Sequence, residues 1–281
     1  MNYTQLLREK TQERMSIVCM GMDPVVEKIP FKGDAEKAIS IFYAMILEAV
    51  KGEDVALNTV KPNYAFYAQY GFPGLRALKK VIELSKKHDM LVILDAKRGD
   101  IGSTSAAYAK EAFDFWGADA VTVAPYMGSD SVGPFIEWCD KGKGVYILNR
   151  TSNKGALDVQ NEMVAGKPVY MKVAERIVAW GKPGTGAVVG ATYPKELEEI
   201  SSFYVKSGKK IPLLIPGVGA QGGSAGDVMK ALKASGNDLT IQRINSSSGI
   251  SFAYLEEKRE DYAGAAVKAI QKLNKEIGYL G

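Results

Sequence analysis

The chain has 281 residues, of which 46% are hydrophobic and 24% charged, a composition typical of a soluble globular protein. The length suits one α/β barrel domain, which commonly occupies about 250 residues. The formal net charge of +4 is too small for the dense basic surface of a nucleic-acid-binding protein, and no apolar run approaches the roughly 18 residues of a membrane span. These features exclude nucleic acid and membrane as expected partners.

Two cysteines, Cys19 and Cys139, lie far apart in the sequence and in no metal-ligand spacing. A disulfide framework is therefore not expected, and a reducing compartment is the simpler interpretation. The first residues, Met1-Asn2-Tyr3-Thr4-Gln5, lack the basic-then-apolar pattern of a signal peptide. We expect a cytoplasmic protein.

Short apolar runs alternate with amphipathic stretches of helical length along the whole chain. The runs predict eight strands, at 16–22, 55–60, 90–94, 120–124, 145–148, 187–190, 212–215 and 239–244. The amphipathic stretches include helices at 36–50, 74–87, 104–115, 170–180, 195–206 and 262–277. This alternation favours parallel β/α units, and eight units fit a single (β/α)₈ barrel domain over residues 1–281. An open, doubly wound sheet would satisfy the alternation equally.

The longest stretch without a clear periodic pattern is 151–167, between the fifth and sixth units. Long loops in compact domains are often lids or binding loops, so this segment is a candidate active-site lid. Polar or glycine-rich groups directly follow most strands, and a barrel would gather them at the carboxyl ends of its strands, where barrel active sites form. These groups are Asp23, Lys61, Asp95 with Lys97, Ser152, 216–223 and 245–248.

The third predicted strand runs directly into four charged residues within six positions, Asp95-Ala96-Lys97-Arg98-Gly99-Asp100. Asp95 and Lys97 are two apart, so an extended backbone would project both to the same side. An isolated Asp-x-Lys pair is more often a solvated ion pair, which contributes only about 0–1 kcal/mol. In an enclosed pocket the same charges form a fixed array that can stabilise a developing charge. Lys61, on the neighbouring strand, is placed to join them.

The run Asp95-x-Lys97-x-x-Asp100-Ile101-x-x-Thr104 resembles the signature of orotidine 5′-monophosphate decarboxylases, in the form found in the longer bacterial branch. Other segments agree in order: Gly21-Met22-Asp23-Pro24, Lys61-Pro62-Asn63, Ala124-Pro125-Tyr126, Thr151-Ser152-Asn153, Gly190-Ala191-Thr192 and 216–223. The resemblance covers roughly residues 19–251. It implies a barrel enzyme of pyrimidine (UMP) biosynthesis that decarboxylates orotidine 5′-monophosphate without a metal or organic cofactor.

By this resemblance, Lys97 protonates C6 of the pyrimidine and stabilises the negative charge that forms there, and Asp95 lies beside the departing carboxylate. Lys61 links the charged array to the ribose. The resemblance also implies a homodimer, in which Asp100 and Thr104 reach the partner's site. Asp23 would bind a ribose hydroxyl, and Ser152 would bind the edge of the base. Without the resemblance, the sequence around Ser152 indicates only an ordinary loop serine.

A glycine-rich segment, Gly217-Val218-Gly219-Ala220-Gln221-Gly222, follows the seventh strand. Gly-x-Gly-x-x-Gly is a weak dinucleotide-binding signal by itself, and in the seventh barrel unit it suits a phosphate site instead. The resemblance places Gln221, Gly222, Ser247 and Ser248 at this site. The family usually carries an arginine where this chain has Ser248.

The missing arginine leaves the source of the phosphate-binding positive charge open. Arg243 lies five residues earlier, near the middle of the predicted strand, and is not expected to substitute. Arg98, Lys154 or a lid lysine such as Lys167 are the sequence's candidates.

Two other functions stay open at this point. Magnesium-dependent sugar-phosphate aldolases and decarboxylases share the Asp-x-Lys-x-x-Asp barrel, but they need a carboxylate-rich metal site, and Lys61-Pro62-Asn63 offers no acidic neighbour. A nucleotide-binding relic without turnover is the non-enzymatic alternative. The intact set Asp95, Lys97, Asp100 and Lys61 counts against it.

Overall fold

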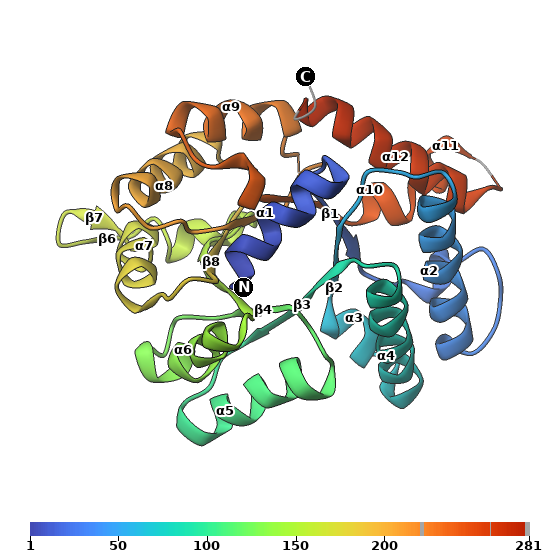
Figure 1. Cartoon of the computed structure of the whole chain (residues 1–281), viewed down its shortest axis with the longest axis horizontal. Helices are drawn as coiled ribbons and strands as arrows, with labels where there is room; N and C mark the ends of the chain where they lie inside the picture. The colour runs from blue at the N-terminus through green and yellow to red at the C-terminus, as the bar shows by residue number, and fades with distance from the viewer. Residues whose placement is uncertain (220–221, 259, 279–281) are drawn as a thin grey trace.

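The computed structural model describes residues 1–219, 222–258 and 260–278. Eight parallel strands close into a barrel in the order β1-β10-β9-β8-β5-β4-β3-β2, with helices around it (Figure 1). The prediction of a (β/α)₈ barrel rather than an open sheet is confirmed. The barrel strands are β1 (Val18–Met22), β2 (Thr59–Pro62), β3 (Leu91–Arg98), β4 (Ala120–Val123), β5 (Gly144–Arg150), β8 (Thr185–Val189), β9 (Leu213–Ile215) and β10 (Arg243–Ser246).

The helices of the outer layer agree with the predicted amphipathic stretches and add several shorter ones. The α-helices are α1 (Tyr3–Arg14), α2 (Ala35–Gly52), α3 (Tyr64–Ala68), α4 (Gly71–Lys87), α5 (Gly102–Lys110), α6 (Ser129–Ile136), α7 (Val169–Trp180), α8 (Pro194–Lys206), α9 (Ala225–Ser235), α10 (Ser248–Ser251), α11 (Ala253–Glu257) and α12 (Tyr262–Ile277). Four 3₁₀ turns are η1 (Val26–Lys28), η3 (Glu137–Lys141), η4 (Lys154–Asp158) and η5 (Leu239–Ile241), and η2 (Glu111–Phe115) is a π-helical turn that continues α5.

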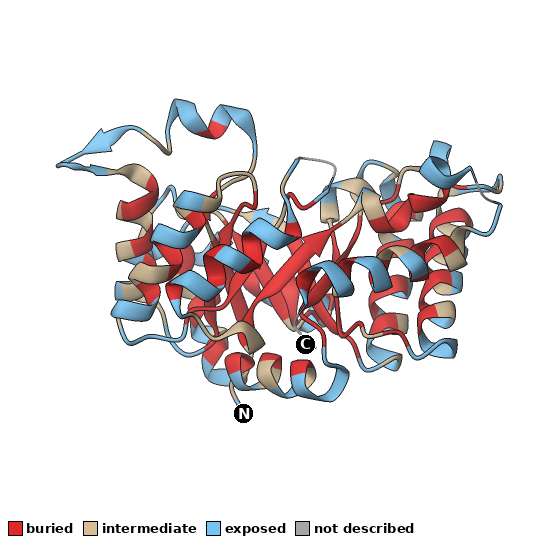
Figure 2. Ribbon diagram, turned by 90° about the horizontal axis from the view of Figure 1, so that it is seen from above, coloured by how far each residue is buried: buried red, intermediate tan, exposed pale blue. Residues whose placement is uncertain are grey.

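The strands are buried along nearly their whole length because helices cover the outside and side chains fill the inside (Figure 2). One apolar cluster lies between the strands and the surrounding helices. A second, smaller cluster fills the barrel interior. Helix α1 supplies Tyr3 and Leu7 to this second cluster, and the Tyr3 ring packs edge-on against Tyr146 of β5 with ring centroids 6.0 Å apart. Helix α1 therefore closes the amino-terminal end of the barrel.

The eighth strand differs from its predicted range of 239–244. Leu239–Ile241 form the turn η5, because Asp238 accepts hydrogen bonds from the backbone N–H and the hydroxyl of Thr240. The strand itself begins at Arg243 and runs to Ser246. The second strand likewise begins at Thr59 rather than Val55, so that Lys61 lies within β2 and not beyond its end.

The candidate lid has more regular structure than its sequence indicates. It contains the 3₁₀ turn η4 and a two-stranded antiparallel hairpin of β6 (Met163–Val164) and β7 (Lys167–Pro168). The hairpin projects from the barrel and is largely exposed, at the upper left of Figure 2. Among the described residues, no helix combines the length and the apolar character that crossing a membrane requires.

Arg243 is fully buried at the amino-terminal end of the barrel and joins it to α1. Its guanidinium donates to Oγ1 of Thr11 at 3.0 Å and to Oγ1 of Thr59 at 2.7 Å, and the Thr11 hydroxyl in turn donates to the carbonyl of Thr240 at 2.7 Å. Thr11 thus links α1 to β10 and η5. Buried charged groups that lose a partner are costly.

We expect Thr11→Val to lower the free energy of unfolding by about 1–3 kcal/mol, because valine keeps the shape but removes both hydrogen bonds. Guanidinium unfolding followed by circular dichroism measures this. Thr11→Ser keeps the hydroxyl and is the matched control. If Thr11→Val unfolds at the same denaturant concentration as wild type, the proposed contribution of this link is wrong.

Candidate active site

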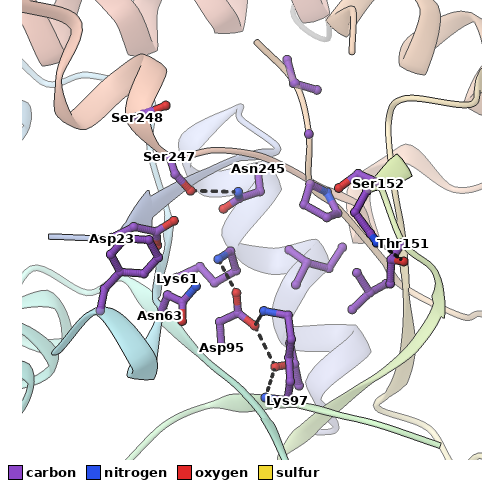
Figure 3. A pocket seen from close by; sticks show the side chains of 18 of the residues that line it. Asp23, Lys61, Asn63, Asp95, Lys97, Thr151, Ser152, Asn245, Ser247 and Ser248 are labelled. Atoms are coloured by element: carbon purple, nitrogen blue, oxygen red, sulfur yellow. Dashed lines mark hydrogen bonds and ion pairs between the residues drawn. The ribbon is translucent and has the colours of Figure 1, made fainter. Parts of the chain in front are cut away.

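A cavity of about 550 Å³ opens at the carboxyl ends of the barrel strands. The seven predicted site residues that line it come from five different strands or the loops that follow them, which is how barrel enzymes assemble their sites. They are Asp23, Lys61, Asp95, Lys97, Ser152, Ser247 and Ser248. Figure 3 shows them converging around one space, with Asp95 and Lys97 at one end and Ser247 and Ser248 at another.

Asp95 is held between two lysines at the floor of this cavity. Lys61 Nζ donates to Oδ2 of Asp95 at 2.7 Å, and Lys97 Nζ donates to Oδ1 at 2.6 Å (Figure 3). The side chains of Asp95 and Lys61 are only 8% and 5% exposed, whereas that of Lys97 is 47% exposed. Lys97 is therefore the most accessible member of this charged array.

The array keeps its buried members ionised. Burial alone would raise the pKa of Asp95, but the charges of Lys61 and Lys97 outweigh burial and hold that pKa well below its usual range. Burial would likewise lower the pKa of Lys61, and the charges of Asp95 and Asp23 raise it above its ordinary value instead. Asp95 and Lys61 are consequently charged throughout the neutral pH range.

Lys97 has an unusual backbone conformation, with φ at +45°. The backbone at Lys97 is therefore not extended as predicted, and the pairing of β3 with β4 shifts its register between Leu94 and Arg98. The side chains of Asp95 and Lys97 nevertheless lie on the same side and meet, as the sequence predicted. A non-glycine residue in this region costs on the order of 1–3 kcal/mol and persists where its surroundings hold it. Here Thr122 of β4 accepts from the backbone N–H of Lys97 at 2.9 Å and donates to Oδ1 of Asp95 at 2.9 Å.

A second part of the cavity lies at the ends of β1 and β10. Asp23 follows β1, and Asn245 lies in β10, whose register with β1 places Asn245 beside Cys19. Oδ1 of Asp23 and Oδ1 of Asn245 are both buried without a hydrogen-bond partner among the described residues. Two unpaired acceptors in one cavity can receive hydrogen bonds from hydroxyl groups of a ligand.

Ser152 lies on the opposite side of the cavity, after β5 (Figure 3). Its carbonyl accepts from Oγ1 of Thr192 at 3.1 Å. Gly190, at the end of β8, allows this close approach, because a Cβ there would come within 2.7 Å of the Cα of Ser152. The close approach of these two loops fixes the position of Ser152.

The described residues of the glycine-rich segment after β9 have glycine-dependent backbone conformations. Gly217, Gly219 and Gly222 have φ values of +100°, +86° and +85°, which suit glycine alone. The backbone N–H of Gly223 donates to the carbonyl of Gly217 at 3.0 Å, which brings these two described residues together. Gly217 lines the cavity and Gly222 does not. Gln221 lies outside the described residues.

Asp100 and Thr104 do not line this cavity. Asp100 accepts from the backbone N–H of Ile101 at 2.8 Å, and Thr104 is exposed on α5. Two large apolar side chains nearby are exposed. Ile101, next to Asp100 in the sequence, is 50% exposed, and Tyr126, in the loop after β4, is 94% exposed. The chain by itself therefore does not bring Asp100 or Thr104 to its own array.

The sequence analysis considered four positively charged residues as replacements for the missing phosphate-binding arginine. None of them lines the cavity: Arg98, Lys154, Lys167 and Arg243. Arg98 is held by Glu111 at 2.9 Å, and Lys167 by Glu175 at 2.5 Å. Arg243 lies at the amino-terminal end of the barrel, away from this cavity, in agreement with the expectation that it does not substitute. The three suggestions Arg98, Lys154 and Lys167 are not supported by their positions.

Sequence reasoning missed several lining residues: Lys28, Phe66 and Thr122. Thr122 carried a usable signal, because it is the one polar residue within the apolar run 120–124. Lys28 carried none, since one lysine in an irregular loop has no pattern. Among the described residues, no three His, Cys, Asp or Glu side chains gather in a way that could hold a metal ion.

Residues 18–260 match the orotidine 5′-phosphate decarboxylase / HUMPS family. A protein of Delftia acidovorans named orotidine 5′-phosphate decarboxylase is 39% identical over 280 residues, which cover 96% of each chain. The solved structure of Leishmania donovani OMP decarboxylase is 33% identical, with a TM-score of 0.77 and 99% of both chains covered. That of Leishmania donovani UMP synthase is 35% identical with a TM-score of 0.79, and this chain spans 56% of its length. The chain belongs to the orotidine 5′-phosphate decarboxylase / HUMPS family.

Proposed function

We propose that this chain converts orotidine 5′-monophosphate to UMP and CO₂ in pyrimidine biosynthesis, as a cofactor-independent carboxy-lyase. The observation that carries the proposal is the Lys61–Asp95–Lys97 array at the floor of a cavity large enough for a nucleotide. The relatives named for this reaction support the substrate. The two described cysteines are free and buried, which suits a reducing cytoplasm.

The array accounts for the chemistry without another reagent. The bond between C6 and the carboxylate breaks, CO₂ leaves, and the electron pair stays on C6. Lys97 is the ammonium that faces the cavity, so it stabilises this charge and then donates a proton to C6, which yields UMP. Asp95 lies beside the departing carboxylate, and its fixed negative charge disfavours the bound substrate more than the transition state.

The rest of the cavity matches the remaining groups of the nucleotide. The unpaired oxygens of Asp23 and Asn245 suit the ribose hydroxyls, and Lys61 lies between them and Asp95. Ser152, across the cavity, suits the polar edge of the pyrimidine. Gly217 and the hydroxyls of Ser247 and Ser248 suit the phosphate. Gly222 and Gln221 are assigned to the phosphate end by resemblance alone.

A homodimer would complete the site. Asp100 and Thr104 lie outside the chain's own cavity, on a surface that also exposes Ile101, Tyr126 and Met127. Large apolar side chains exposed near residues of this kind suit a subunit interface. In the proposed dimer, each chain lends Asp100 and Thr104 to the array of its partner.

Residues 151–167 are proposed as a lid that Arg150 anchors. Arg150 is fully buried at the end of β5 and pairs with Glu196. Gln160 joins the lid to this point: its Oε1 accepts from the backbone N–H of Thr151 at 2.9 Å and from Nη1 of Arg150 at 3.4 Å. Its Nε2 donates to the Thr151 hydroxyl at 2.7 Å, one residue from Ser152. The anchor therefore supports both the lid and the base-binding serine.

The first test follows loss of orotidine 5′-monophosphate absorbance with EDTA present. Lys97→Ala is expected to lower kcat by at least about 10²- to 10³-fold, because it removes both the stabilising charge and the proton donor. Lys206→Ala, at the end of α8 and away from the cavity, is the control and keeps wild-type rates. An absence of turnover by wild type at saturating substrate would overturn the proposed function.

The shared site has its own test by subunit mixing. Asp100→Asn and Lys97→Ala are each expected to abolish most turnover. In mixed dimers, one of the two sites combines an intact Lys97 with an intact Asp100 from the other chain, so random mixing restores about a quarter of wild-type activity. Either variant mixed with itself is the control. If mixing restores nothing while both variants still form dimers by light scattering, Asp100 is not shared.

The lid anchor is tested by Gln160→Ala. We expect the KM for orotidine 5′-monophosphate to rise by roughly tenfold, since the loss of these hydrogen bonds frees the lid and Ser152. Limited proteolysis within 151–167 should accelerate in parallel. Asp158→Ala changes an exposed neighbour in the same loop and is the matched control. Unchanged KM and unchanged cleavage in Gln160→Ala would show that Gln160 does not anchor the lid.

A further inference from the structure

The phosphate end of the cavity has hydroxyls and backbone amides but no arginine. Ser247 and Ser248 follow β10, and Gly217 and Val218 follow β9, and all four line the cavity. A phosphate monoester carries up to two negative charges near neutral pH, and neutral donors alone leave these charges uncompensated. A positive charge near Ser248 would restore the balance.

Among the described residues, three positively charged side chains line the cavity: Lys28, Lys61 and Lys97. Lys61 and Lys97 are both bound to Asp95, at the floor of the cavity. Lys28 forms no ion pair with any described residue and is exposed. It is therefore the one lining cation, within the described part of the chain, whose charge is not already committed to a carboxylate.

Lys28 lies beside the segment that follows Ser248. It ends the turn η1 after β1, the strand that pairs directly with β10. Its Nζ is 5.5 Å from the ring centroid of Phe252, which comes directly after α10 and also lines the cavity. The hydroxyl of Tyr254 donates to the carbonyl of Lys28 and ties the turn to α11. These contacts place Lys28 beside Phe252 and α11, on the wall of the same cavity that Ser247 and Ser248 line.

We propose that Lys28 supplies the positive charge for the substrate phosphate in place of an arginine at Ser248. The inference rests on the proposed function, because it assigns a specificity-determining residue to that same site. A lysine acts on phosphate as a mobile point charge rather than as a bidentate donor. Its ε-ammonium, which forms no ion pair with a described residue, and its long stem suit a phosphate held by the hydroxyls of Ser247 and Ser248.

The test compares ligands with and without phosphate. Lys28→Ala is expected to raise the KM for orotidine 5′-monophosphate by about 10- to 100-fold and to weaken UMP binding, measured by calorimetry, by a similar factor. Uridine lacks the phosphate, so its affinity should change less than about twofold. Lys32→Ala, an exposed lysine of the same loop that does not line the cavity, is the matched control.

Two further variants sharpen the result. Lys28→Arg keeps the charge and should stay near wild type, and Ser248→Arg placed in the Lys28→Ala background should recover most of the lost UMP affinity. The inference is overturned if Lys28→Ala binds UMP as wild type does, or if UMP and uridine affinities fall by the same factor. A wild-type protein that binds UMP without turning over orotidine 5′-monophosphate would contradict the proposed function, and the binding comparison would still decide the role of Lys28.

Discussion

The carboxylate of Asp95 is buried between two ammonium groups, and the positions of the neighbouring cavity residues depend on this interaction. Ionised groups are costly to bury, and removing one partner of a buried pair typically costs about 3–5 kcal/mol because the other charge is left uncompensated. Lys61, Asp95 and Lys97 must therefore act as one unit. The barrel makes this unit possible because β2 and β3 are neighbours, and because β4 adds the Thr122 hydroxyl, which binds both the carboxylate and the strained backbone of Lys97.

The closed sheet also explains how distant parts of the chain meet. Parallel strands that all end at one rim bring residues from all eight barrel strands, or from the loops that follow them, to a single cavity. The opposite rim carries the stabilising contacts instead, with α1, Tyr146 and Arg243 filling and closing it. Chemistry and stability are thus separated along the barrel axis. This separation allows strained or unpaired groups, such as Lys97 and Asp23, to persist at the catalytic rim.

Much of this arrangement was predictable from the sequence, for a physical reason. Alternating strands and helices indicate parallel units, and polar groups directly after each strand must then share one rim, so Asp23, Lys61, Asp95 and Ser152 could be placed together. Three features were not predictable. Leu239 and Ile241 look like strand residues, and only the Asp238 cap makes them a turn. The register shift at Lys97 comes with a hydrogen bond from its backbone to Thr122 of another strand, and the local sequence does not indicate that contact. Lys28 belongs to no periodic pattern at all.

The closure of the barrel bears directly on the serine at position 248. Because β1 pairs with β10, the loop after the first strand lies beside the loop after the last, although more than 200 residues separate them in sequence. A positive charge can therefore occupy the same region of the cavity from either loop. An arginine after β10 would approach the phosphate from the β10 side. In the proposal, Lys28 approaches it from the neighbouring β1 side, over Phe252. The phosphate requires a positive charge near it. Because the sheet is closed, either the loop after β1 or the loop after β10 can supply that charge.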